Sequence, residues 1–289
     1  MTLTVPALRA RVARRRRHRP LSVRLAAAFL LVVAGAGLLA PLLAPHSPDA
    51  TSLTNALAPP GTPGHWLGTD STGRDVLTRV LYGARLSLLA PLGVVLLSAV
   101  LGITTGLVAA RVGGRVDAVL SRCMDIVFAF PSLLLAMIAV AVFGPGLAAP
   151  VCALAISYMP FLGRIVRSVA LQEGARPYME AYRVMGFGGL WVTLRHLLPN
   201  VAPVLIAQGT LSFGYALVDL ASLSYLGLGV RPPDADWGSM ISQAQSAILQ
   251  GSPWSGIVPG LAVLLTVVSV NVIGEHVGGS ISGRGKEET

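Results

Sequence analysis

Residues 86–110 read LSLLAPLGVVLLSAVLGITTGLVAA, without one charged side chain. An α-helix rises about 1.5 Å per residue and the hydrocarbon core of a bilayer is about 30 Å thick, so roughly 17 to 25 apolar residues are needed to cross it. Leu86–Ala110 has that length. We therefore predict that it spans a membrane as a helix, with Gly93, Gly102 and Gly106 allowing close packing against other helices.

Similar uncharged runs recur along the chain, which has 289 residues, 53% of them hydrophobic and 12% charged. The charged fraction is about half that of an ordinary soluble domain. The predicted fold class is therefore an all-α polytopic membrane protein with six transmembrane helices. The other predicted spans are Leu25–Ala44, Ile126–Phe143, Leu147–Leu162, Val201–Val218 and Ile257–Ile273.

The arginines indicate how these helices are oriented. Seven of them lie between Arg9 and Arg19, and the loops after the second and fourth spans are also basic. Cytoplasmic flanks of membrane helices collect Lys and Arg, so we expect both termini in the cytoplasm. This placement explains the formal net charge of +9, and no nucleic-acid partner is expected. Leu25–Ala44 is longer than the roughly 7 to 15 residues of a signal-peptide core, which favours a retained helix.

The spacing of the runs predicts one compact five-helix block, preceded by an anchor helix and an external loop rich in Pro, Gly, Thr and Asp. The expected segments are a basic cytoplasmic tail at 1–24, the first transmembrane helix at 25–44, the external loop at 45–85, the five-helix block at 86–275 with a cytoplasmic loop at 170–199, and a cytoplasmic tail at 276–289.

The cytoplasmic loop contains the sequence ARPYMEAYRVMGFGGLWVTLRHLLP, residues 175–199. Pro177 suits the first position of a helix and Gly186 suits the left-handed position after a helix end, so we predict two short helices with a turn between them. An apolar stripe on the first of them must be covered by the rest of the chain, by lipid or by a groove on a partner protein. The stripe is formed by Tyr178, Ala181, Tyr182 and Met185.

The spacing of Glu180, Ala181, Gly186, Leu198 and Pro199 resembles the loop signature of binding-protein-dependent ABC permeases. Two positions depart from that signature. Tyr182 replaces a small residue and His196 replaces an aliphatic one, although the peptide and nickel branch of the family often has a His-hydrophobic-Leu-Pro-Asn ending like the one here.

The resemblance implies the fold of a type I ABC importer permease in the bacterial plasma (inner) membrane. It implies that the loop is a coupling helix docking in a groove of an ATPase subunit. The partners implied are a second permease subunit, two ATPase subunits, an extracytoplasmic substrate-binding protein and membrane lipid. ATP and Mg would bind to the ATPase subunits, and no cofactor is expected on this chain. The coupling residues implied are Tyr178, Glu180, Ala181, Tyr182, Met185, Gly186, Leu198 and Pro199.

The external loop carries a second motif, which resembles one in the dipeptide, oligopeptide and nickel permeases. By the residues alone it is structural: Asp70 suits a turn in which its side chain accepts from nearby backbone N–H groups, and Arg74 with Asp75 suits a solvated ion pair. The branch implies that small peptides are transported, while nickel or another small solute stays open. The motif residues are Gly68, Thr69, Asp70, Gly73, Arg74 and Asp75.

Acidic residues near the predicted spans are few. Asp219, at the outer end of the fifth span, is a candidate pathway residue that faces either a peptide's amino group or the membrane interface. Asp125 is expected to be satisfied by water or by a neighbouring arginine. His46 and His65 share the external loop without other ligands nearby in the sequence, so no metal site is predicted.

Motifs for ATP hydrolysis and for intramembrane catalysis are missing from the sequence. The only lysine, Lys286, is not part of a Gly-x4-Gly-Lys-Ser/Thr loop, so we predict a transport subunit without its own ATPase site rather than an enzyme. A secondary transporter is the alternative of a different class, but the spans have almost no interior charge for ion coupling. A membrane scaffold would leave the cytoplasmic apolar stripe unexplained.

Overall fold

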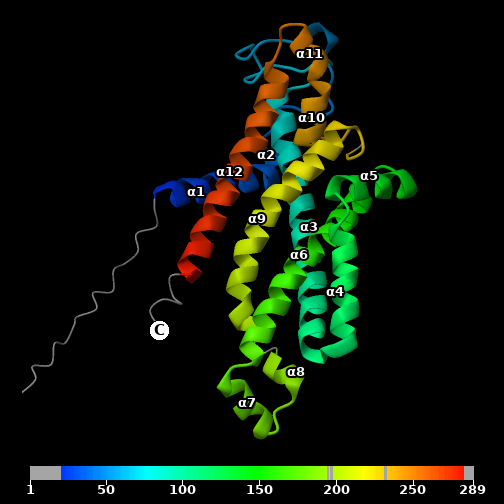
Figure 1. The fold of residues 1–289 in the computed structure, drawn as a ribbon. Helices are drawn as coiled ribbons and strands as arrows, with labels where there is room; N and C mark the ends of the chain where they lie inside the picture. The colour runs from blue at the N-terminus through cyan, green and yellow to red at the C-terminus, as the bar shows by residue number, and fades with distance from the viewer. Residues whose placement is uncertain (1–20, 194, 196–197, 231–232, 283–289) are drawn as a thin grey trace, which may run out of the picture.

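The computed structural model describes residues 21–193, 195, 198–230 and 233–282. Four long helices run along the length of the molecule: α3 (Val76–Val112), α6 (Ala148–Gly174), α9 (Leu198–Tyr225) and α12 (Trp254–Ser282). Figure 1 shows α1 (Leu21–Leu38) lying across the long axis of this bundle, followed by the short α2 (Ala40–Leu43). No strand occurs among the described residues, only the two isolated bridges Thr62–His65 and Thr69–Asp75.

Five of these helices, including α1, are long and apolar enough to cross a membrane. A sixth span is obtained if α4 (Gly114–Phe128) and α5 (Ser132–Phe143) count as one, although they meet at a bend of 84°. The span predicted over Ile126–Phe143 is therefore bent rather than straight. Pro131 at the bend has no backbone N–H and restricts the residue before it, so the chain leaves the helix there.

Most helix ends differ from those predicted, among them the start of α3 and the end of α12. Helix α3 begins at Val76 rather than Leu86, because Asp75 caps it by accepting a hydrogen bond from the backbone N–H of Thr78 at 2.8 Å. Arg79 in its first turns is buried and donates to the carbonyl of Pro48 at 3.3 Å. At the other end of the chain, α12 continues past residue 275 to Ser282.

Glycines allow α3 and α6 to approach closely. A Cβ atom added at Gly102 would lie 2.8 Å from Leu162 Cβ, and one at Gly106 would lie 2.5 Å from the carbonyl oxygen of Gly163. Real Cβ contacts are not this short, so side chains at these two positions would force the helices apart. Gly93 is different, since its added Cβ would meet only Val151 at 3.6 Å. The predicted packing role is confirmed for Gly102 and Gly106.

We expect the Gly106→Ala variant to lower the thermal unfolding midpoint in detergent, because overpacking of a close contact costs typically about 1–3 kcal/mol. The matched control is Gly93→Ala, which adds the same methyl group to the same helix where there is room for it. A midpoint for Gly106→Ala equal to that of Gly93→Ala would contradict the close-approach argument.

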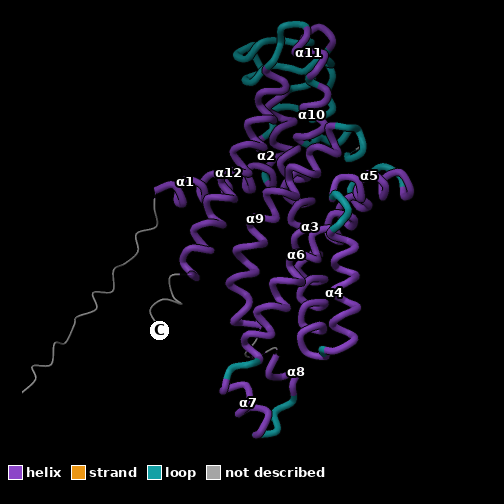
Figure 2. Tube along the Cα trace, viewed as in Figure 1, coloured by secondary structure: helices purple, strands orange, loops and turns teal. Residues whose placement is uncertain are grey.

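Three short elements and the loops around them build a lobe at one end of the bundle (Figure 1), which we name the external lobe after the predicted side of its loop. Figure 2 shows loops gathered there, around η1 (Leu53–Asn55), α10 (Trp237–Gln243) and α11 (Gln245–Leu249). Trp237 is buried against α3, where its indole N–H donates to the Val80 carbonyl at 3.1 Å. Asp236 caps α10 through the N–H groups of Gly238 and Ser239. The lobe is thus tied to α3, and Gly238 lies against Ala221 of α9.

Large apolar side chains remain exposed along the sides of the bundle. They lie on α1, α3, α5, α9 and α12, and such a wide apolar surface suits contact with lipid rather than with water. Examples are Leu31, Val32, Leu96, Val100, Phe143, Ile206 and Leu264.

Candidate functional site

The loop between α6 and α9 folds as predicted into two short helices, α7 (Pro177–Val184) and α8 (Gly189–Val192). Gly186, two residues past the end of α7, has a φ of +76°. The N–H of Phe187 donates to the carbonyl of Tyr182 at 3.1 Å across this glycine. A six-to-one bond across a left-handed glycine is a Schellman C-cap, which satisfies a carbonyl at the helix end.

Three aromatic rings join α7 to α8. The Tyr182 ring meets the Phe187 ring edge-on at a centroid distance of 5.6 Å, and Phe187 stacks on Trp191 at 4.8 Å. Trp191 in turn lies 6.2 Å from Tyr182. Since aromatic pairs in such arrangements each add about 0.5–1.5 kcal/mol, the two short helices hold each other in one orientation.

The outer surface of this pair of helices is apolar and open. Val184 is 84% exposed and Met185 61%, and Phe187 and Trp191 are exposed beside them. Of the predicted stripe, Ala181 and Met185 are exposed while Tyr178 and Tyr182 are half-buried. Glu180 and Gly186 are exposed as well. We call the exposed residues Ala181, Val184, Met185, Phe187 and Trp191 the apolar face.

The apolar face is anchored to the long helices through Glu173, near the end of α6. Its carboxylate is buried, accepts a hydrogen bond from the Tyr178 hydroxyl at 2.8 Å and pairs with Arg176 at 2.9 Å. Glu173 was not identified from the sequence, although an acidic residue at the end of an apolar helix was an available signal. Leu198 and Pro199 form the first turn of α9, which packs onto α6 through Val166, Ala170 and Val201.

The external motif forms a compact hydrogen-bonded turn, as its residues predicted. Asp70 Oδ1 accepts from the backbone N–H groups of Thr72 at 2.8 Å and Arg74 at 3.0 Å. Burial alone would raise the pKa of Asp70, but these bonds, the Thr72 hydroxyl and the Arg74 charge outweigh it and hold that pKa below its usual value. The Thr69 hydroxyl donates a hydrogen bond to the Asn55 carbonyl and accepts one from the Ala58 N–H.

The glycines of the motif are needed for space and conformation. Gly68 and Gly73 have φ values of +77° and +76°, and a Cβ atom at either would overlap a backbone carbonyl, of Ala58 and Ser52 respectively. Side chains at these positions would therefore disrupt the hydrogen-bonded turn.

The predicted ion pair between Arg74 and Asp75 is wrong. Arg74 pairs with Asp70 at 2.7 Å and donates to the Gln243 amide oxygen at 2.6 Å, which joins the hydrogen-bonded turn to α10. Asp75 points the other way and lies 3.0 Å from His65 Nδ1. The two carboxylates separate because Asp70 closes a turn while Asp75 caps a helix.

Asp219 on α9 joins three helices. Its Oδ2 accepts from the Ser132 hydroxyl on α5 and from the Tyr158 hydroxyl on α6, both at 2.9 Å. Because both bonds use the same oxygen, Oδ1 accepts no hydrogen bond from the described residues. Ser132 directly follows the bend between α4 and α5, which places the half-buried carboxylate beside the broken span. Ser132 and Tyr158 were not identified from the sequence.

Two arginines of α6 hold α4. Arg164 pairs with Asp125 at 2.8 Å, which confirms the expected arginine partner of that carboxylate. Arg167 holds both oxygens of Asp117, at 2.5 and 2.6 Å. A bidentate pair of this kind fixes the orientation of both side chains, so α4 and α6 are held together near the end that carries α7.

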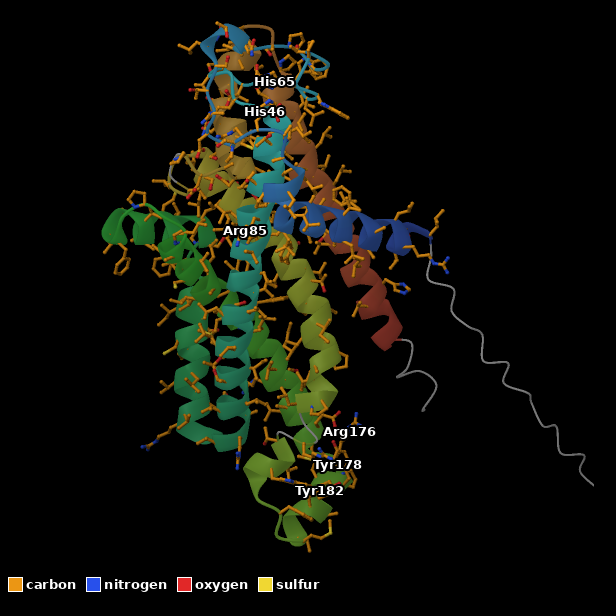
Figure 3. The ribbon with its side chains drawn as sticks, turned by 180° about the vertical axis from the view of Figure 1, so that it is seen from behind. His46, His65, Arg85, Arg176, Tyr178 and Tyr182 are labelled. Atoms are coloured by element: carbon orange, nitrogen blue, oxygen red, sulfur yellow. The ribbon has the colours of Figure 1, made fainter. Side chains whose placement is uncertain are left out.

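The predicted sites do not form one centre. Figure 3 shows His46 and His65 in the external lobe and Arg176, Tyr178 and Tyr182 at the opposite end of the molecule. Asp219 lies on the helix that runs between these ends. The candidate sites therefore lie at the two ends of the bundle and on a helix between them.

Comparison with known proteins agrees with this arrangement. Residues 102–282 match the family described as binding-protein-dependent transport system inner membrane component. The chain is 41% identical over 252 residues to the di/tripeptide transport system permease protein DppC of Pseudomonas aeruginosa, covering 86% of this chain and 83% of that protein. It is 39% identical over 237 residues to the probable D,D-dipeptide transport system permease protein DdpC of Escherichia coli, covering 82% and 79%.

Among solved structures, the chain is similar to a chain of the MetNI methionine ABC transporter in an inward-facing conformation. The TM-score is 0.55 at 19% sequence identity, and the match covers 69% of this chain and 94% of the other. At this identity the likeness concerns the fold alone. It confirms the predicted helical fold of an ABC importer permease.

Proposed function

This chain belongs to the family of binding-protein-dependent transport system inner membrane components, and we propose that it is the permease subunit of an ABC importer of small peptides. It is a multi-pass protein of the bacterial inner membrane. The observation that carries the proposal is the apolar face on α7 and α8, held rigid at the end of the bundle away from the external lobe.

The apolar face is the docking surface for an ATPase subunit. Basic residues close to it, among them Arg164, Arg167 and Arg176, favour a cytoplasmic position, so both chain termini are cytoplasmic and the external lobe is extracytoplasmic. ATP is hydrolysed by two partner subunits, and a second permease completes the path. Closure of the ATPases moves α7, and the Glu173 anchor passes this motion to α6. The work comes from the higher affinity of ATP for the closed ATPase state.

Small peptides are the proposed substrates, delivered by an extracytoplasmic binding protein. Relatives covering most of the chain are named for dipeptide, di/tripeptide and glutathione transport. Within the chain, Asp219 is the residue that supports this choice, because Oδ1 can accept from a peptide's ammonium group while Oδ2 stays bonded to Ser132 and Tyr158. A carboxylate in a membrane helix is costly, which favours a functional role.

The experiment that tests the proposal purifies the tagged chain, coexpressed with its permease partner, and assays for a bound ATPase. Reconstituted vesicles are then tested for ATP-dependent uptake of a labelled dipeptide, with a non-hydrolysable ATP analogue as control. We expect ATPase capture, and uptake that unlabelled di- and tripeptides inhibit but nickel does not.

Failure to retain any ATPase in the presence of the permease partner would overturn the proposal in favour of a secondary transporter. If an ATPase is captured but only nickel inhibits uptake, the assignment as an importer permease stands and the proposed substrate changes from peptides to nickel.

A further inference from the structure

Three possible metal ligands meet in the external lobe, from three separate parts of the sequence. His46 follows α2, His65 lies in the loop and Asp75 caps α3. One ligand atom from each lies within 4.8 Å of the others. The histidines lack other ligands nearby in the sequence, but the loop folds back and brings Asp75 to them in three dimensions.

The backbone holds these positions in place. The N–H of His65 donates to the Thr62 carbonyl at 2.8 Å, and its carbonyl accepts from the Gly68 N–H at 3.1 Å. Asp75 is held through Oδ2, which caps α3, and this leaves Oδ1 facing His65. The side chains of His65 and Asp75 are only 11% and 1% exposed, so both are largely withdrawn from water.

The third side chain is exposed and can adjust. The His46 ring stacks on the His65 ring at a centroid distance of 4.9 Å. Donor atoms around a tetrahedral zinc ion, each about 2.0–2.1 Å from the metal, lie roughly 3.4 Å apart. The observed separations of up to 4.8 Å therefore need a shift of about an ångström, which a change of the His46 rotamer supplies.

From this geometry we infer that His46, His65 and Asp75 bind a divalent transition-metal ion of the zinc type, with a fourth position open to solvent. Two imidazoles and one carboxylate suit Zn²⁺ or Co²⁺, whereas Ca²⁺ and Mg²⁺ prefer sites built from oxygen. The ion joins the segment after α2 to the residue that caps α3 and so stabilises the fold of the external lobe. Transport activity is not part of this inference.

Cobalt is the probe of choice, because Co²⁺ bound by nitrogen and oxygen ligands absorbs visible light. The full-length chain, purified in detergent with a tag that lacks histidine, is titrated with Co²⁺ and then with Zn²⁺ in competition. We expect a visible band that saturates at one ion per chain and disappears when Zn²⁺ is added. His46→Ala should weaken Co²⁺ binding at least tenfold, while the control His276→Ala on α12 should leave it unchanged.

A second measurement guards against a folding defect in the variant. Zn²⁺ should raise the thermal unfolding midpoint of the wild-type chain, EDTA should reverse the increase, and Ca²⁺ should not produce it. His46→Ala should unfold at the midpoint of the metal-free wild type and gain nothing from Zn²⁺. Equal Co²⁺ affinity in wild type and His46→Ala, or no saturable band in the wild type, would overturn the inference and leave His65 and Asp75 as a hydrogen-bonded pair alone.

Discussion

A valine at Gly186 is expected to reduce ATPase capture and peptide uptake by about 5- to 30-fold while membrane insertion stays normal. Gly186 has a φ of +76°, which a side chain branched at Cβ adopts at a cost of about 1–2 kcal/mol. The space around it is open, so the penalty comes from the backbone and not from a clash. Losing this conformation breaks the hydrogen bond from Phe187 to Tyr182 and frees α8 from α7.

Gly188→Val is the matched control for this prediction. Gly188 lies two residues further along, has equally open surroundings and lacks a positive φ, so valine fits there. Co-purified ATPase per permease and initial uptake rate are measured for both variants. If the two valines had the same effect, bulk in the loop would be responsible and the C-cap argument would fail.

The second large effect is expected for Asp219→Asn, with uptake of dipeptides that have a free amino group reduced about 10- to 100-fold. The asparagine oxygen can still accept from Ser132 and Tyr158, since both use the single atom Oδ2, so the contact between the three helices survives. The negative charge is lost, and hydrogen bonds to a charged group contribute about 1.5–3 kcal/mol. The variant should also stop discriminating between free and N-acetylated dipeptides.

Tyr158→Phe is the complementary variant. It removes one bond of the helix contact and leaves the Asp219 charge in place, so discrimination against N-acetylated dipeptides should persist. Uptake of both dipeptides is measured in vesicles of each variant at equal permease density. If Asp219 served only as a contact between helices, the result would be the reverse: dipeptide uptake would fall more in Tyr158→Phe than in Asp219→Asn.

The membrane-spanning architecture was predictable because it depends on composition along the chain. Apolar runs of bilayer length identify spans wherever the chain folds. The two short helices between α6 and α9 were equally predictable, since Pro177 and Gly186 act through their own backbone conformations. The bend in the third span was indicated by Pro131 within an apolar run, but its angle of 84° was not, because a proline marks a kink without fixing its size.

The partners of the charged and polar side chains were decided only by tertiary structure. Arg74 bonds to Asp70 and Gln243 rather than to its neighbour Asp75, and Asp75 meets His65 across ten residues. Asp219 gains Ser132 and Tyr158 from two other helices. Hydrogen bonds act over about 3 Å, so these pairings require the final positions of helices and loops, which local sequence does not contain. Local composition therefore determined that the chain crosses the membrane, and the tertiary fold determined which polar groups of the chain meet.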